Sequence, residues 1–158
     1  MKESKKINVT DLLLFIVATQ LAGTISALIS GNFSGTYLQL VKPPLSPPAW
    51  VFPVVWTILY TLMGISAYII YSSDDGDREK ALTVYWIQLF VNFLWSIIFF
   101  RFRLLTASVA VIITLLLLIA VMIKMFRDIK AAAGYINIPY LVWVVFAAYL
   151  NIAAAILN

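Results

Sequence analysis

The stretch LLTASVAVIITLLLLIAVMI, residues 104–123, decides the class of fold. It contains no charged residue and reaches the length of about 20 apolar residues that a helix needs to cross the core of a bilayer. Four other uncharged stretches are as long or longer, and they cover residues 12–41, 43–73, 81–100 and 131–158. The sequence therefore predicts an all-α membrane protein, a bundle of five transmembrane helices.

Composition supports this class and excludes several others. Of the 158 residues, 63% are hydrophobic and 11% are charged, whereas soluble domains carry about 25% charged residues. The 15% aromatic content excludes a disordered chain. The chain has no cysteine and no histidine, the residues most used for metal binding and for acid–base catalysis. We expect no metal site, no required cofactor and no nucleic-acid partner.

We expect the chain to form a single membrane domain over residues 1–158, with a long loop between its first two helices. Lys2, Lys5 and Lys6 precede the first apolar segment, but its length and the lack of a cleavage site favour an uncleaved helix over a signal peptide. The predicted helices cover residues 11–29, 48–72, 81–101, 104–126 and 135–156.

Prolines shape the predicted start of the second helix. The run KPPLSPP at residues 42–48 cannot be helical, because each proline lacks a backbone donor and restricts the residue before it. Ser46 is the expected N-cap, with Pro47 in the first helical position. Pro53 is expected to bend this helix, either for function or only for packing.

The basic residues predict the orientation of the chain. Only three of the 11 basic residues, Lys42, Arg101 and Arg103, lie on the side opposite the amino terminus. Cytoplasmic loops carry the excess of Lys and Arg, so the amino terminus should be cytoplasmic and the carboxyl terminus outside, in a bacterial cytoplasmic membrane. These three cations have two possible roles. They favour an anionic ligand on the outer face, with Lys42 as its contact. Alternatively, Arg101 and Arg103 only extend to the membrane interface.

Polar groups inside the predicted spans are uncharged, which argues against proton pumps, ion-coupled transporters and voltage sensors. Gln88, Asn92 and Ser96 follow i, i+4, i+8 spacing and form one stripe on the third span. The stripe either joins helices by hydrogen bonds or faces a cavity, and the neighbouring Trp95 favours the cavity.

The positions of the tryptophans also indicate what lies inside the bundle. Trp50 and Trp86 lie near helix ends and suit the interfacial aromatic belt, whereas Trp56, Trp95 and Trp143 lie deeper. The deep rings either pack or form the wall of a ligand site. A molecule dissolved in lipid gains little free energy by entering an apolar site, so its binding must come from other contacts. Ring stacking, a few hydrogen bonds and a basic rim favour a large flat aromatic ligand with an acidic edge.

Three signatures resemble the tryptophan-rich sensory protein/translocator protein family. They are KPPLSPPAWVFPVVWTILY at residues 42–60, QLFVNFLWSIIFF at residues 88–100 and PYLVWVVFAAYLN at residues 139–151. The resemblance implies a five-helix bundle with a pocket beneath the first loop. In that family the pocket binds porphyrins, such as protoporphyrin IX and haem-type tetrapyrroles, and synthetic isoquinoline or benzodiazepine ligands.

The resemblance also implies a set of ligand-binding residues in this chain. They are Gly23, Tyr37, Pro47, Trp56, Tyr60, Asn92, Trp95, Trp143, Phe146 and Ala147. It implies a second copy of the chain as partner as well, because family members often form homodimers. Tyr149 is followed by no basic residue, so the cholesterol motif of mammalian members lacks its cation.

Three functions stay open on the sequence alone. The first is a membrane receptor or sensor that binds porphyrins and is linked to stress response or tetrapyrrole homeostasis. The second is light- and oxygen-dependent porphyrin breakdown, for which the resemblance points to Trp56 and Trp143 as the catalytic pair. The third is passive transport of porphyrins or other lipophiles, since the sequence has no energy-coupling motif.

Overall fold

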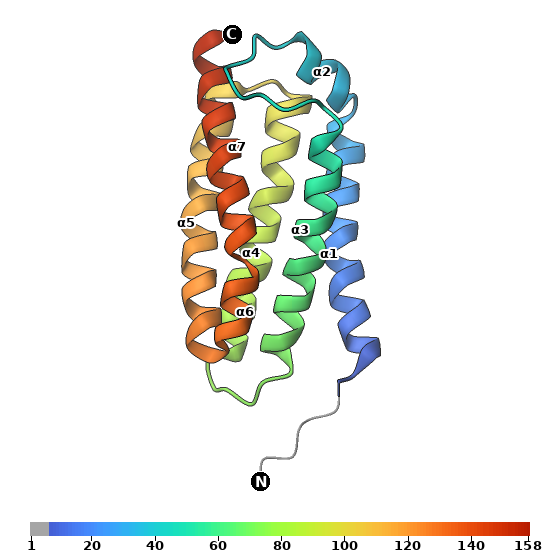
Figure 1. Ribbon diagram of the computed structural model, residues 1–158, viewed down its shortest axis with the longest axis vertical. Helices are drawn as coiled ribbons and strands as arrows, with labels where there is room; N and C mark the ends of the chain where they lie inside the picture. Colours follow the sequence, from blue (N-terminus) through green and yellow to red (C-terminus); the bar gives the residue numbers. More distant parts are fainter. Residues whose placement is uncertain (1–6) are drawn as a thin grey trace.

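Five helices of the protein are long and apolar enough to cross a membrane, and they run side by side as one bundle in the computed structural model (Figure 1). The structure describes residues 7–158, and this part of the chain contains helices and no strand. The prediction of an all-α bundle with five spans is confirmed. The elements are α1 (Val9–Ser30), α2 (Phe33–Gln39), α3 (Val51–Tyr71), α4 (Arg78–Ser96), η1 (Ile97–Arg101), α5 (Leu105–Ile129), α6 (Ala131–Ile136) and α7 (Ile138–Leu157).

The two ends of the bundle differ in what closes them. Helix α2, the residues that lead into α3 and the carboxyl terminus gather at one end, here called the loop end (Figure 1). The start of α1, the α3–α4 turn and helix α6 lie at the opposite end. Helix α1 packs chiefly on α3, and α5 packs on both α4 and α7.

Several predicted helices are too short, because a charged residue ends the apolar stretch in the sequence but does not end the helix. Helix α4 begins at Arg78 rather than at residue 81, and α5 continues past residue 126 to Ile129. The last turns of α5 carry an ion pair between Lys124 and Asp128 at 3.3 Å, with the i, i+4 spacing that supports a helix. Helix α1 begins at Val9, two residues before the predicted start, because the Asn8 side chain accepts bonds from the Thr10 and Asp11 amides.

The predicted start of the second span is wrong. Helix α3 begins at Val51, not at residue 48, and the Ser46 hydroxyl donates to the Pro43 carbonyl at 2.8 Å instead of capping the helix. Pro53 therefore lies in the first turn, where its missing N–H has no partner to lose, and the predicted cause of a bend is absent. The preceding connection is also more ordered than a plain loop, because Asn32 accepts from the Gly35 amide and caps α2.

The fifth span starts earlier than predicted and is interrupted. It begins with α6 at Ala131 rather than at residue 135, and Asn137 separates α6 from α7. The buried Asn137 amide donates to the Ser66 hydroxyl at 2.5 Å and to the Ala133 carbonyl at 2.9 Å. This amide links the interruption to α3. The Ser66 hydroxyl and the Ala133 carbonyl beside the break therefore both have a hydrogen-bond partner.

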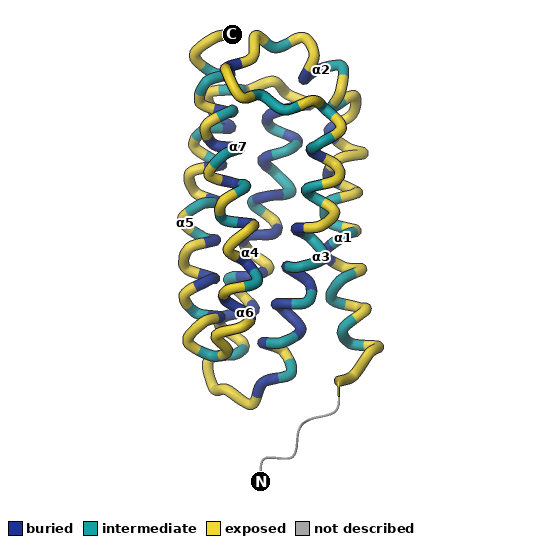
Figure 2. The backbone as a smooth tube through the Cα atoms, viewed as in Figure 1, coloured by how far each residue is buried: buried dark blue, intermediate teal, exposed yellow. Residues whose placement is uncertain are grey.

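Burial divides each helix into an inner and an outer side (Figure 2). The inner sides meet around fully buried residues such as Met63, Tyr85 and Phe126, whereas large apolar residues such as Leu14 and Leu117 are exposed on the outer side. An apolar outer side suits lipid, which offers no hydrophobic gain when helices associate. Close packing of small residues must therefore contribute to association.

Gly64 of α3 provides a close approach to the backbone of α1. A Cβ added there would lie 2.7 Å from the Ile16 Cα atom, which is backbone and cannot rotate away. We expect Gly64→Ala to destabilise the bundle by about 1–3 kcal/mol through overpacking, despite the higher helix propensity of alanine. The matched control is Gly76→Ala, because a Cβ at Gly76 would meet no atom within 4 Å.

Thermal unfolding of both variants in detergent measures the difference. A lower Tm for Gly64→Ala alone supports the close α1–α3 contact, and equal Tm values for the two variants would contradict it.

Candidate functional site

A cavity of about 370 Å³ lies between α1, α3 and α4 in the half of the bundle nearest the loop end. This volume falls within the range of about 300–1,000 Å³ that is usual for small-molecule sites. Its wall combines aromatic side chains with small and polar residues, and the residues from α3 and α4 include Trp56, Tyr60, Asn92 and Trp95. We call it the α1–α3 cavity.

Gly23 of α1 sets the position of the aromatic rings on the facing helix. The Tyr60 ring lies so close to Gly23 that any Cβ there would collide with it. Trp56, one turn earlier on α3, stacks on Tyr60 with 5.3 Å between ring centroids and 29° between planes. The absence of a side chain at Gly23 therefore lets α3 present a continuous aromatic surface to the cavity.

Asn92 is the amide of this wall, and its orientation is fixed from behind. Its Nδ2 donates to the Tyr140 hydroxyl at 2.9 Å, and that hydroxyl donates to Gln88 Oε1 at 2.8 Å. Asn92 Oδ1 receives only a long bond of 3.4 Å, from the Tyr60 hydroxyl. The donor side of the amide is thus engaged in the core, and its oxygen retains accepting capacity for a ligand.

The polar stripe on α4 satisfies both of its predicted interpretations. Gln88 and Asn92 are buried and join α4 to α7 through Tyr140, and Ser96 joins α4 to α1 through the Ser30 hydroxyl at 2.9 Å. Asn92 and Ser96 also line the α1–α3 cavity. The same groups therefore hold helices together and form the polar part of the wall.

Trp95 is locked in place by a second polar network. Its Nε1 donates to Asn151 Oδ1 at 2.9 Å, and Asn151 Nδ2 donates to the Ser108 hydroxyl at 2.9 Å and to the Leu105 carbonyl at 3.2 Å. These bonds join α4, α5 and α7. The indole of Trp95 is therefore a fixed part of the wall.

A second, much smaller cavity of about 30 Å³ lies beneath the loop end. Its lining includes Tyr37, Lys42, Trp95 and Ala147, and we call it the loop cavity. The Tyr37 hydroxyl donates to the Pro47 carbonyl at 2.6 Å, and Lys42 Nζ lies 5.0 Å from the Tyr37 ring centroid. Burial raises the pKa of Tyr37, against a smaller lowering by a hydrogen bond with Ser46, so the phenol stays a protonated donor at neutral pH.

The predicted site residues divide between the two cavities. Five of them line the α1–α3 cavity, namely Gly23, Trp56, Tyr60, Asn92 and Trp95. Tyr37, Lys42 and Ala147 line the loop cavity, which shares Trp95. Pro47, Trp143 and Phe146 line neither of these two cavities. Neither of these two cavities therefore contains both Trp56 and Trp143, the pair implied for porphyrin breakdown.

Phe52 and Phe33 are wall residues that the sequence analysis did not predict. Phe52 lines both cavities, and Phe33 from α2 lines the α1–α3 cavity. Phe52 precedes Trp56 by one helical turn, so i, i+4 spacing could have placed it on the same face. No comparable signal marks Phe33, since it belongs to a connection whose path depends on tertiary contacts.

The two arginines of the loop end form hydrogen bonds with residues near the ends of other helices. Arg101 donates to the Ile29 carbonyl at 3.0 Å, and Arg103 donates to Gln39 Oε1 at 2.6 Å. They therefore hold the ends of α1 and α2, in addition to lying at a helix end as predicted.

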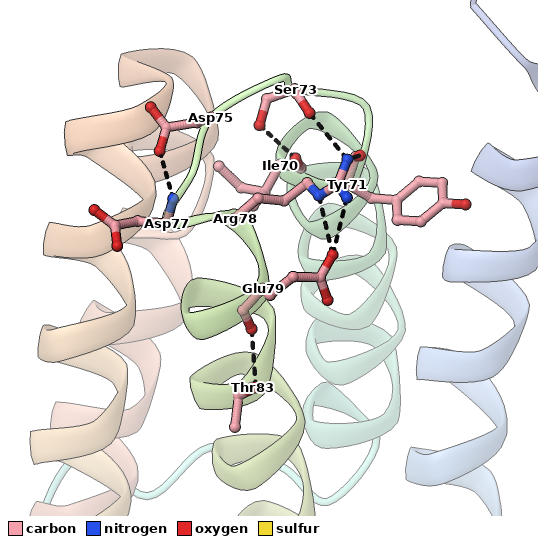
Figure 3. Close-up of polar contacts among 8 residues, drawn as sticks. All are labelled: Ile70, Tyr71, Ser73, Asp75, Asp77, Arg78, Glu79 and Thr83. Carbon is pink, nitrogen blue, oxygen red and sulfur yellow. Dashed lines mark hydrogen bonds and ion pairs between the residues drawn. The ribbon is translucent and has the colours of Figure 1, made fainter.

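The polar cluster at the opposite end is likewise occupied by its own chain (Figure 3). Arg78 donates to the Tyr71 and Ser73 carbonyls at 3.4 and 3.2 Å and pairs with Glu79 at 3.0 Å. These contacts close the α3–α4 turn. The α1–α3 cavity is consequently the stronger candidate for a ligand site.

Comparison with known proteins identifies the family of the chain. Residues 15–157 match the sequence profile of the TspO/MBR family. The chain is 34% identical over 146 residues to the tryptophan-rich sensory protein of Cereibacter sphaeroides, which covers 92% of this chain and 90% of that protein. It is 31% identical over 129 residues to the translocator protein of Homo sapiens, covering 80% of this chain and 76% of that protein.

A third relative extends the similarity to an archaeon. The chain is 33% identical over 150 residues to the tryptophan-rich protein TspO of Archaeoglobus fulgidus, with 88% of this chain and 97% of that protein covered. The resemblance inferred from the three sequence signatures is thereby confirmed. With five membrane-spanning helices and a match over nearly its whole length, the chain belongs to the TspO/MBR family of integral membrane proteins.

Proposed function

We propose that this protein is a membrane receptor or sensor that binds porphyrins, such as protoporphyrin IX, and other flat hydrophobic ligands in the α1–α3 cavity. One observation carries the proposal: a cavity of about 370 Å³ inside an apolar bundle has Trp56, Tyr60 and Trp95 in its wall beside the single amide of Asn92. This combination offers flat surfaces for stacking and an amide oxygen that can accept a hydrogen bond.

The physics of the bilayer favours this ligand class over a simple alkyl chain. An apolar molecule that leaves lipid for protein gains almost no hydrophobic free energy. Ring stacking contributes about 0.5–1.5 kcal/mol per aromatic pair beyond area burial. A conjugated macrocycle can stack on several rings at once, whereas an alkyl chain cannot.

An anionic edge on the ligand suits the loop end. Lys42 is exposed, and its Nζ lies above the Tyr37 ring at the rim of the loop cavity. A porphyrin propionate beside Lys42 would remain near water while the macrocycle lies deeper in the bundle. We propose that Lys42 forms this pair.

The orientation that suits this arrangement has the loop end outside a bacterial cytoplasmic membrane. The start of α1, the α3–α4 turn and α6 share the opposite end (Figure 1). Arg78, Lys80, Lys124, Arg127 and Lys130 belong to the turns and helix ends there. The loop end has only Lys42, Arg101 and Arg103, and the rule of positive cytoplasmic loops supports an amino terminus inside.

Trp56→Leu tests the stacking wall. Loss of one aromatic pair should weaken protoporphyrin IX binding about two- to twelvefold, measured by titration of the purified protein in detergent. Trp86→Leu is the matched control, because Trp86 is 44% exposed and lies outside both cavities. Equal affinities for wild type and Trp56→Leu would contradict the proposed site, as would an equal loss in the Trp86 variant.

Lys42→Gln tests the anionic edge. An exposed ion pair contributes up to about 1 kcal/mol, so the variant should bind protoporphyrin IX up to about fivefold more weakly at low salt. The dimethyl ester of protoporphyrin IX, which has no propionate charge, should bind wild type and variant alike. Lys124→Gln, at the opposite end of the bundle, serves as the control. A loss that is the same for acid and ester would exclude the ion pair.

Single cysteines test the orientation, since the natural chain has none. Leu45→Cys lies in the exposed loop before α3, and Asp75→Cys lies in the α3–α4 turn. A membrane-impermeant maleimide added to intact cells should label Leu45→Cys and label Asp75→Cys only after the cells are opened. The reverse pattern would show that the loop end faces the cytoplasm.

A further inference from the structure

Phe52 stands between the two cavities. It lines both the α1–α3 cavity and the loop cavity, together with Trp95 and Phe100. The Phe52 ring is edge-on to three other rings, with centroid distances of 5.3 Å to Phe33, 5.1 Å to Tyr37 and 5.8 Å to Trp143. These three aromatic rings and the two cavities therefore meet at this side chain.

Of the three rings that separate the cavities, Phe52 has the weakest constraints. Trp95 is held by its hydrogen bond to Asn151. Phe100 belongs to the π-helical segment and packs between Phe33 and Phe99 at 4.7 and 4.6 Å. Phe52 occupies the first turn of α3, which has no side-chain cap, and a phenylalanine ring makes no hydrogen bond that its rotation would break.

A buried donor belongs to a ring that contacts Phe52. Trp143 Nε1 is shielded from solvent and has no hydrogen-bond partner among the described residues 7–158. A buried N–H without an acceptor is costly, and such groups in native proteins call for an explanation. The ring of Phe52 packs against this indole, and Phe52 lines the α1–α3 cavity whereas Trp143 does not.

We propose that Phe52 is a gate that selects ligands by size, an inference that rests on the proposed function. Ligands of two or three rings fit the α1–α3 cavity of about 370 Å³ while Phe52 stays in place. A macrocycle that extends from the α1–α3 cavity to Lys42 of the loop cavity requires the Phe52 ring to swing aside, which joins the two cavities into one chamber. The joined chamber extends from Asn92 toward Ala147, and the N–H of Trp143 becomes available to an acceptor on the ligand.

Two substitutions of opposite size test the gate. Phe52→Ala removes the ring and should raise the association rate of protoporphyrin IX by about tenfold, because a gate that must open limits entry. Phe52→Trp enlarges the barrier and should lower that rate by about tenfold. The rates are measured by stopped-flow quenching of tryptophan fluorescence in detergent, with an isoquinoline carboxamide as the small probe. Its association rate should change by less than about twofold in either variant.

Phe126→Ala controls for the loss of a buried ring, since Phe126 is fully buried and lines neither cavity. It should lower the Tm as Phe52→Ala does while leaving both association rates unchanged. If both Phe52 variants bind protoporphyrin IX at the wild-type rate, the gate is refuted and the proposed function stands. If neither probe binds wild type or any variant, the proposed function itself fails and the gate fails with it.

Discussion

The surrounding lipid sets the constraint on which this structure depends. Helices that are already in an apolar solvent gain little by burying apolar surface, so packing of small residues and buried hydrogen bonds must hold them together. Gly64 lets α1 approach α3, and the side-chain amides of Asn92, Asn137 and Asn151 each form a hydrogen bond to a different helix. The three amides therefore fix the relative positions of α3, α4, α5 and α7.

The proposed ligand site is built from the same hydrogen bonds. Asn92 uses its N–H group to reach Tyr140 and keeps an oxygen near the cavity, while Asn151 accepts from Trp95 and holds that indole in the wall. A group that joins helices and a group that binds a ligand are thus not alternatives in this bundle. Preorganised groups of this kind lose little freedom when a ligand arrives.

The sequence predicts the spans well because absence of charge over a membrane thickness is a physical requirement. It predicts the stripe at Gln88 and Asn92 because helical spacing determines a shared face. It fails at Ser46 and Asn137, where local patterns compete with tertiary contacts: Ser46 bonds within the loop, and Asn137 interrupts the last span while bonded to Ser66. The contact of Phe52 with Trp143, at 5.8 Å between ring centroids, joins two different helices, so no spacing rule could predict it.

The contrast between Trp95 and Phe52 follows from what each ring would lose by moving. Displacing Trp95 would break its hydrogen bond to Asn151 and leave both polar groups unpaired. Unpaired polar groups are most costly in a low-dielectric interior such as this one. Displacing Phe52 breaks only ring contacts, and a flat aromatic ligand can replace these with contacts of the same kind. A cavity wall inside a membrane can therefore be rigid where it is hydrogen-bonded and adaptable where it is purely aromatic.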